Sequence, residues 1–211
     1  MSGIYIHIPF CKQACHYCDF HFSTNLKKKD EMVLALAKEI EMRKSEFQDE
    51  IVETIYFGGG TPSILQIADL KFLIDAVYKN YKVVENPEIT VEANPDDLTE
   101  NRIIELSNNK VNRLSIGIQS FFEDDLQLMN RAHNVEEAKK CLEIATHYFD
   151  NISIDLIYGV PEMSNEKWLQ NIETALSFGV PHISSYALTV EPKTALHSFI
   201  QKGIIPQPDD E

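Results

Sequence analysis

The sequence predicts an α/β fold with six parallel strands. Six short apolar stretches, rich in β-branched and aromatic residues, alternate with stretches of helical periodicity along the 211 residues. Strict alternation of strand and helix is typical of a parallel sheet joined by right-handed crossovers. Six such units are two fewer than the eight of a complete TIM barrel. A chain of this length suits one large domain with a sizeable core.

The six strands are predicted from apolar runs rich in β-branched and aromatic residues. The first run alternates Ile4, Ile6 and Ile8 and ends at Pro9. The later strands have such runs as IVETIYF, ITVEA, RLSIGI, ISIDLIY and HISSYAL. The strands are therefore expected at residues 4–8, 51–57, 89–93, 113–118, 152–158 and 182–188.

Helices are predicted between these strands from apolar spacing of three to four residues and from capping residues. Met32 and Ile40 belong to the apolar positions of the first helix. Thr61, with Pro62 after it, is expected to cap the second helix, and Thr99 the third. The helices are expected at residues 30–45, 64–78, 99–107 and 165–178, with a broken helical stretch over 123–148.

The composition limits the classes of partner. The chain has 33 acidic and 19 basic residues, a net charge of -14, which argues against a nucleic-acid backbone as its main partner. No apolar run is long enough to span a membrane, so no transmembrane segment is expected. Four cysteines at these positions favour a reducing, cytoplasmic compartment. Cys141 lies in a helical pattern and is expected to be a buried core thiol.

Three cysteines near the N-terminus form the motif with the most chemistry. Cys11, Cys15 and Cys18 have C-x3-C-x2-C spacing, which is too tight for easy disulfide geometry and leaves one thiol over. Soft thiolate ligands select zinc, copper(I) or iron–sulfur. One interpretation is a four-iron cluster with one iron that has no protein ligand. The alternatives are a structural zinc site and incidental cysteines. The fourth zinc ligand would be one of three nearby histidines, namely His7, His16 or His21.

The motif and its surroundings resemble a known family. The spacing, an aromatic Phe20 just beyond it, and the segments YIHIPFC and YCDF resemble the radical S-adenosylmethionine (radical SAM) enzymes, in particular the oxygen-independent coproporphyrinogen III oxidase group. The resemblance implies a partial (βα)6 TIM-like barrel over residues 1–202 and a [4Fe-4S] cluster on the three cysteines. It also implies S-adenosylmethionine at the open iron, which is cleaved to a 5′-deoxyadenosyl radical. Residues 203–211 are expected to be a linker to an absent C-terminal domain.

Candidate cofactor-binding residues lie where the strands end, as in other parallel α/β folds. The glycines after the second strand could let a ligand approach the backbone or could simply form a tight turn. Glu92 could accept hydrogen bonds from a ribose diol or could form a structural salt bridge. The resemblance implies that Gly59, Gly60 and Thr61 bind the methionine amino group and that Glu92 binds the ribose.

Five further residues are placed near the cofactor or the cluster by the same resemblance. Gln119 follows the fourth strand, Arg131 lies in the segment LMNRAHN, and Asp155 lies inside the fifth strand. Each falls where the oxidase group has a cofactor-contacting residue, although a buried Asp is often structural. Tyr5 and His7 share the face of the first strand that is opposite its isoleucines, and the resemblance places them near the cofactor and cluster. No catalytic residue is predicted.

Two functions fit these motifs best. The first is a haem chaperone of the same group, which binds S-adenosylmethionine and haem and delivers haem to proteins such as cytochromes. The alternative is the oxidase itself, which converts coproporphyrinogen III to protoporphyrinogen IX. The oxidase typically has a fourth cysteine at the position of Phe20 and an N-terminal extension, whereas this chain begins ten residues before Cys11. Both differences favour the chaperone. A radical SAM enzyme with another substrate is a third possibility.

The sequence names no clear haem ligand. His133 and His21 are candidates, but an exposed loop or helix-terminal histidine is the simpler interpretation of each.

Overall fold

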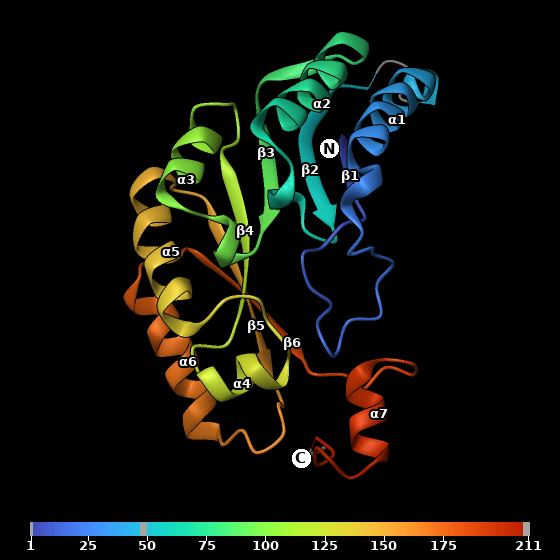
Figure 1. Cartoon of the computed structure of the whole chain (residues 1–211). Coiled ribbons are helices and arrows are strands. Elements are labelled where there is room, and N and C mark those ends of the chain that lie inside the picture. Colours follow the sequence, from blue (N-terminus) through green and yellow to red (C-terminus); the bar gives the residue numbers. More distant parts are fainter. Residues whose placement is uncertain (1, 47–49, 209–211) are drawn as a thin grey trace.

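The computed structural model describes residues 2–46 and 50–208, and its centre is one six-stranded parallel sheet (Figure 1). The strand order in the sheet is β1-β2-β3-β4-β5-β6, the order of the sequence. The strands are β1 (Ser2–Ile8), β2 (Val52–Gly59), β3 (Val83–Ala93), β4 (Arg113–Gln119), β5 (Ile152–Tyr158) and β6 (His182–Ala187). The predicted partial (βα)6 barrel is confirmed, because all neighbouring strands pair in parallel and β1 does not pair with β6.

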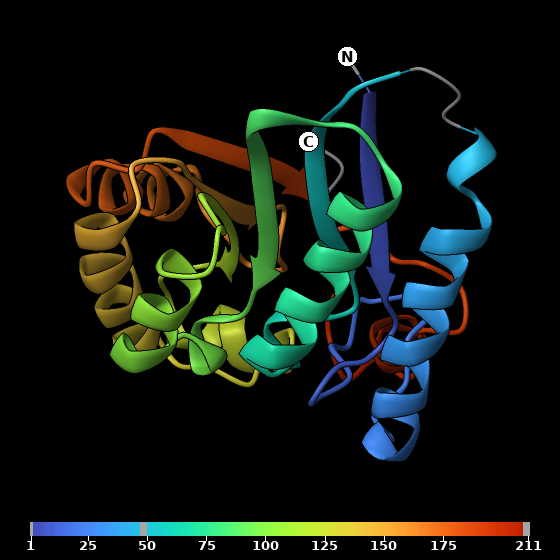
Figure 2. The same cartoon turned by 90° about the horizontal axis from the view of Figure 1, so that it is seen from above.

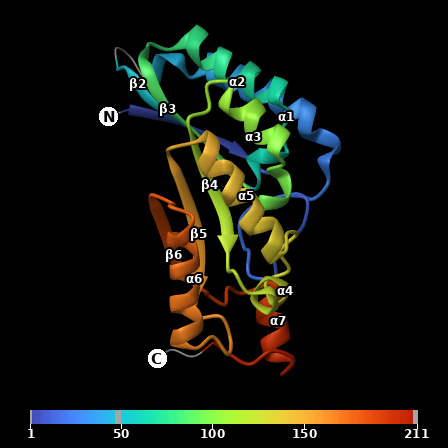
Figure 3. The ribbon, with the colours of Figure 1, turned by 90° about the vertical axis from the view of Figure 1, so that its left-hand side faces the viewer.

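The helices are α1 (Lys29–Met42), α2 (Ile67–Asn80), α3 (Glu100–Ser107), α4 (Glu123–Leu128), α5 (Val135–Tyr148), α6 (Asn165–Ser177) and α7 (Ala195–Gln201). Of these, α1, α2, α3, α5 and α6 cover the outer face of the curved sheet, whereas α4 and α7 lie at the carboxyl ends of the strands (Figures 2 and 3). The core lies between sheet and helices, where Phe57, Ile116 and Ile154 pack with Leu73 and Leu142, all fully buried. Cys141 belongs to this core, as predicted. No helix in the described part of the chain is long and apolar enough to cross a membrane.

The second helix differs from its prediction. Thr61 precedes a 3-10 turn at Pro62–Ile64 and makes no capping hydrogen bond through its side chain. The α-helix begins at Ile67 instead, where Gln66 and Asp69 form a reciprocal capping box. Thr61 is buried and is hydrogen-bonded to the Cys11 thiol, so its hydroxyl is used in the site.

Other boundaries agree with the sequence to within a few residues. Thr99 caps α3 by accepting a hydrogen bond from the backbone N–H of Arg102, as expected. The helical stretch over 123–148 is broken into α4 and α5. β3 begins at Val83, six residues before the predicted start at Ile89. The helix α7 was not predicted, and residues 209–211 of the expected linker lie outside the described residues.

The cysteine loop between β1 and α1 is held at both ends. The backbone N–H of Cys11 donates to the carbonyl of Ser23 at 3.1 Å, which closes the loop at its base. At the far end, the carbonyl of His16 accepts a hydrogen bond of 2.8 Å from the backbone N–H of Leu196 at the start of α7. The His16 ring also stands edge-on to Phe199, with centroids 5.0 Å apart. The loop is thus fixed between the sheet and α7 (Figure 1).

Candidate functional site

A cavity of about 980 Å³ opens at the carboxyl ends of the strands, beneath the cysteine loop. This is the edge at which parallel α/β barrels bind their ligands. The three cysteines and the eight predicted cofactor-binding residues all line this one cavity: Tyr5, Cys11, Cys15, Cys18, Gly59, Gly60, Thr61, Glu92, Gln119, Arg131 and Asp155. The structure therefore brings the candidate residues together, while their individual roles remain predictions.

The three thiols of the loop are free and half-buried. Burial raises the pKa of Cys11, and the neighbouring Cys15 adds to this rise, whereas the hydrogen bond with Thr61 opposes it. Burial likewise raises the pKa of Cys18. Cys11 and Cys18 therefore hold their protons more tightly than a free thiol does.

Arg131 is placed directly behind the cysteine loop. Its Nη1 lies 3.3 Å from the sulfur of Cys15, and its Nη2 donates to Oδ1 of Asn94 at 2.7 Å and to the carbonyl of Gly117 at 2.9 Å. Tyr17 lies 3.4 Å from Nη1. Arg131 therefore ties the loop to the ends of β3 and β4. Much of the guanidinium that was predicted for the cofactor is already occupied by protein acceptors.

Glu92 points into the cavity from β3 with both carboxylate oxygens hydrogen-bonded. Oε1 accepts from the hydroxyl of Tyr56 at 2.8 Å, and Oε2 accepts from the backbone N–H of Gly59 at 3.1 Å. Burial raises the pKa of Glu92, and these two hydrogen bonds oppose the rise. Within the described residues no ion pair involves Glu92, so the salt-bridge alternative does not hold there.

The glycines after β2 are required by the protein's own packing. Gly59 has φ +113°, and a Cβ there would stand 2.5 Å from the ring of His7. At Gly60 a Cβ would stand 2.6 Å from the carbonyl oxygen of Phe10. The tight-turn interpretation is thus confirmed for the backbone, and the turn still borders the cavity.

Gln119 and Asp155 form the opposite wall. Gln119 ends β4 in the left-handed region, at φ +67°, and its side-chain nitrogen lies over Gly117. Asp155 is in register with Gly117 on one side and with Ser184 on the other. Burial, followed by the charge of Glu92, raises the pKa of Asp155 to about 6. Asp155 can therefore hold a proton at mildly acidic pH and donate a hydrogen bond into the cavity.

Exposed aromatic side chains surround the opening. Tyr5 on β1 is 56% exposed, Tyr186 on β6 is 56% exposed, and Phe20 after the cysteines is 71% exposed. All three line the cavity. Tyr5 is supported from behind by Tyr56, with ring centroids 5.8 Å apart and planes 21° apart. Apolar rings left open around a cavity are suited to a flat ligand that buries them.

The histidines do not all lie where the sequence suggested. His133 is buried, so the expectation of an exposed residue was wrong. Its Nε2 lies 3.1 Å from the carbonyl oxygen of Ile118, and its Nδ1 has no partner in the described part of the chain. The short loop that contains His133 turns into the protein beside Arg131 rather than towards the surface. His16 is also turned from the cavity, because its Nδ1 lies 2.8 Å from the carbonyl of Leu128. His7 and His21 do line the cavity.

Several supporting residues were missed by the sequence reasoning. Tyr56 holds Glu92, Asn94 holds Arg131, and Tyr17 contacts Arg131 from within the cysteine loop. Period-two alternation could have found the first two, because Tyr56 lies on the inner face of β2 and Asn94 follows Glu92 by two residues. Nothing in the sequence marks Tyr17, since it is brought to Arg131 only by the folding of the loop.

Comparison with known proteins identifies the family. The model of the Radical SAM superfamily matches residues 5–175, and the chain belongs to this superfamily. Membership implies a [4Fe-4S] cluster and S-adenosylmethionine as cofactors.

Individual proteins within the superfamily are also similar to this chain. The "Heme chaperone HemW" of Bacillus subtilis is 39% identical over 100% of the chain and 56% of that protein. The protein of the same name from Escherichia coli is 37% identical over 98% of the chain and 55% of that protein. Among solved structures, the coproporphyrinogen III oxidase HemN of Escherichia coli superposes with a TM-score of 0.86 and 28% identity over 98% of the chain and 48% of that protein. The chain spans about half the length of the relatives it matches.

The residues present fit an iron–sulfur cluster. Three free thiols border one cavity, and soft sulfur is the donor type that such clusters require. Within residues 2–46 and 50–208, no three His, Cys, Asp or Glu side chains are gathered closely enough to hold a single metal ion. Cys11, Cys15 and Cys18 would hold the cluster, which supplies one-electron reduction of S-adenosylmethionine when it is bound. The protein's own part is to position the thiols through Arg131 and Thr61.

Proposed function

We propose that this protein binds S-adenosylmethionine and haem in one cavity and acts as a haem chaperone rather than as a porphyrinogen oxidase. The observation that carries the proposal is the ring of exposed aromatic side chains around the cavity that contains the three thiols. The HemW relatives, at 39% and 37% identity, support it. Phe20, at the position where the oxidase resemblance calls for a fourth cysteine, supports it as well.

The polar wall suits S-adenosylmethionine. Glu92 presents a carboxylate that can accept further hydrogen bonds from a ribose diol, since each oxygen has only one donor among the described residues. Gln119 offers an amide from the facing wall, and a protonated Asp155 offers a donor beside it. The turn at Gly59 and Gly60, together with Thr61, borders the cavity between Glu92 and Cys11, where the methionine end of the cofactor would meet the cluster.

The aromatic rim suits haem. Ligand cavities commonly measure about 300–1,000 Å³, so a cavity of about 980 Å³ is at the upper end of that range. Tyr5, Tyr186 and Phe20 border it from β1, β6 and the cysteine loop, which lets rings contact a macrocycle from different sides. Haem-accepting proteins of the cytochrome type would be the partners to which the bound haem is delivered.

The second candidate is oxidative decarboxylation of coproporphyrinogen III. The likeness to HemN, at a TM-score of 0.86 and 28% identity, favours it. Both functions use the same cofactors, so cofactor binding alone does not separate them.

An anaerobic assay separates the two functions. The protein is reconstituted with iron and sulfide and given S-adenosylmethionine, a reductant and coproporphyrinogen III, and the tetrapyrroles are separated and counted. A parallel sample is titrated with haem and followed by its absorbance. The proposal predicts stoichiometric haem binding and no protoporphyrinogen. Protoporphyrinogen formed over many turnovers, or protein with bound S-adenosylmethionine that takes up no haem, would overturn it.

A further inference from the structure

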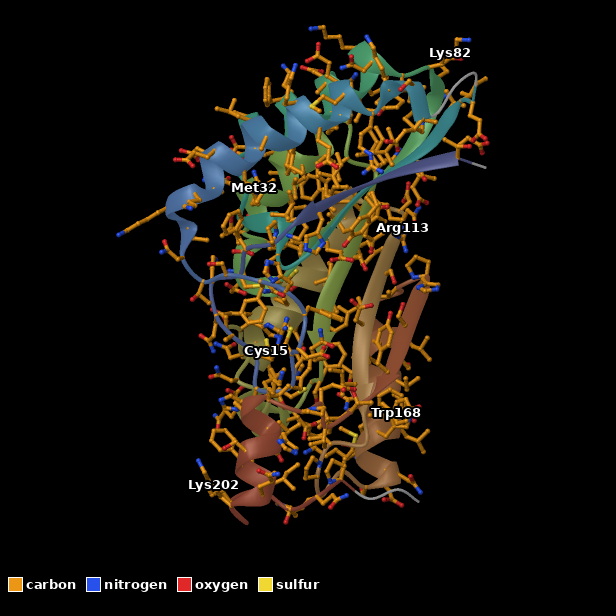
Figure 4. All side chains as sticks on the ribbon, turned by 90° about the vertical axis from the view of Figure 1, so that its right-hand side faces the viewer. Cys15, Met32, Lys82, Arg113, Trp168 and Lys202 are labelled. Atoms are coloured by element: carbon orange, nitrogen blue, oxygen red, sulfur yellow. The ribbon has the colours of Figure 1, made fainter. Side chains whose placement is uncertain are left out.

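We infer that Arg113, one inward-facing position beyond the cavity-lining Ser115, receives an acid side chain of the bound tetrapyrrole. The inference rests on the proposed function, because it names how the haem-type ligand would be held. Arg113 begins β4 and is half-buried on the inner face of the sheet. Figure 4 shows it on the same open side of the molecule as Cys15, farther along the sheet from the cysteine loop.

The guanidinium of Arg113 is largely unused by the protein. Its only hydrogen bond among the described residues runs from Nη1 to the hydroxyl of Thr90, at 3.3 Å. Within the same residues it takes part in no ion pair. A guanidinium has five N–H donors, so one contact leaves most of them open.

The other three arginines, in contrast to Arg113, have several acceptors for their guanidinium groups. Arg43 pairs with Glu39 and Glu46 on the surface of the protein. Arg102 pairs with Glu105 and also donates to a backbone carbonyl. These arginines have acceptors within the protein, as does Arg131 behind the cysteine loop.

Arg113 lies within reach of the cavity. It is in register with Thr90, and the next inward pair along these strands is Glu92 and Ser115, both of which line the cavity. Residues two apart on a strand are separated by about 7 Å and share one face. The positive charge of Arg113 also partly offsets the rise in the pKa of Asp155 that burial and Glu92 cause. A ligand that rests on Tyr5 and Tyr186 could therefore extend an acid side chain past Ser115 to the guanidinium.

The charge pattern favours an acid side chain at this position. Four acids, Asp19, Glu92, Asp155 and Glu191, border the cavity and disfavour a carboxylate there, and the guanidinium of Arg131 in its wall is already bound to protein acceptors. Arg113 lies below them, where a planar guanidinium can bind a carboxylate through two parallel hydrogen bonds. Haem and the porphyrinogens both have propionate side chains, whereas the carboxylate of S-adenosylmethionine would be the competing source of the same chemistry.

The test compares haem with haem dimethyl ester, in which both propionates are blocked. Each is titrated anaerobically into reconstituted wild-type protein and into R113Q, R113K and the matched surface control R43Q. We expect R113Q to weaken haem binding about 10- to 100-fold, the loss typical of a hydrogen bond to a charged group. R113K should lose less because it keeps the charge, and R43Q should bind haem like the wild type. The ester should bind wild type weakly and be insensitive to R113Q.

The remaining outcomes overturn the inference. Haem binding that R113Q leaves unchanged, or that it weakens equally for the ester, would show that Arg113 does not hold a propionate. A fall in S-adenosylmethionine affinity in R113Q, with haem affinity unchanged, would assign the guanidinium to the cofactor instead. Wild-type protein that binds the ester as tightly as haem would reject the inference without any variant. Wild-type protein that binds no haem at all would reject the proposed function as well.

Discussion

The two faces of the β-sheet differ sharply although they are built from the same strands. On β4, Ile116 points outwards and is fully buried beneath helices, while Ser115 points inwards and lines the cavity. On β5, Ile154 is in the core and Asp155 faces the cavity. The outer face is apolar and closed, and the inner face is polar and open.

The outer face of the sheet therefore serves mainly stability, and the inner face serves mainly ligand binding. Burial of apolar side chains against the helices supplies the main favourable term in folding. The inner face contributes little of this, because the open sheet does not close on itself and polar side chains line the cavity. Side chains on the inner face are therefore free to serve ligands. Substitutions on the two faces should affect different measurements.

The largest expected effect is the loss of the cluster from the inner side. Replacing Cys15 by Ser removes one of three thiolate ligands, and the variant should retain no cluster after anaerobic reconstitution. The measurements are iron content and visible absorbance, with Cys11→Ser and Cys18→Ser in parallel. Cys141→Ala is the matched control, because its thiol is buried in the core and the variant should load iron normally. An intact cluster spectrum in any of the three ligand variants would refute the assignment.

A pair of neighbours on β4 tests the comparison directly. Ile116→Ala removes a fully buried side chain from the outer face and should lower the free energy of unfolding by about 2–5 kcal/mol. Ser115→Ala, one residue away on the inner face, should change it by less than about 1 kcal/mol. Denaturant unfolding of both variants measures the difference. Equal losses would show that the inner face also stabilises the fold.

The same contrast explains what the sequence could predict. Apolar runs rich in β-branched and aromatic residues located all six strands, because these strands are packed against helices. The eleven candidate residues meet in one cavity because the carboxyl ends of parallel strands lie at one edge of the sheet. These conclusions depend on local patterns and on a general property of the fold.

Contacts between distant residues were beyond the sequence. Arg131 lies 116 residues from Cys15 in the chain, and no local pattern indicates that their side chains touch. His133 was expected to be exposed, but its loop turns inwards beside Arg131. The helix α7 was missed because it is short, and it is stabilised by the carbonyl of His16 and by Phe199 packing on the His16 ring. Tertiary packing decided each of these features.

A third prediction concerns how the free energy of unfolding depends on pH through Asp155 on the inner face. The pKa of Asp155 is raised to about 6, so ionising it in the folded protein is unfavourable. The unfolded chain loses this proton near pH 4, so the contribution of Asp155 to stability should fall as the pH rises from about 4 to about 6 and then level off. Asp155→Asn removes this penalty, which is about 2–3 kcal/mol at pH 7 by the same relation. The variant should thus be more stable than wild type at pH 7 and no more stable at pH 4.

Unfolding free energies of wild type and Asp155→Asn from pH 4 to 8 provide the measurement. Glu191→Gln, which removes the charge of another acid that lines the cavity, is the matched control. A difference between Asp155→Asn and wild type that does not change with pH would show that Asp155 is not the titrating group.

The smallest effects should appear in cofactor affinity at Glu92. Glu92→Ala removes the carboxylate proposed for the ribose and should weaken S-adenosylmethionine binding by about 1–3 kcal/mol, the range for hydrogen bonds to a charged group. Tyr56→Phe keeps the carboxylate but removes its 2.8 Å hydrogen bond, while the backbone N–H of Gly59 still holds the other oxygen. This variant should lose only about 0.5–1.5 kcal/mol. Calorimetric titration of both variants with S-adenosylmethionine shows which loses more affinity. Unchanged affinity in Glu92→Ala would mean that Glu92 is a structural acid that orders the turn after β2.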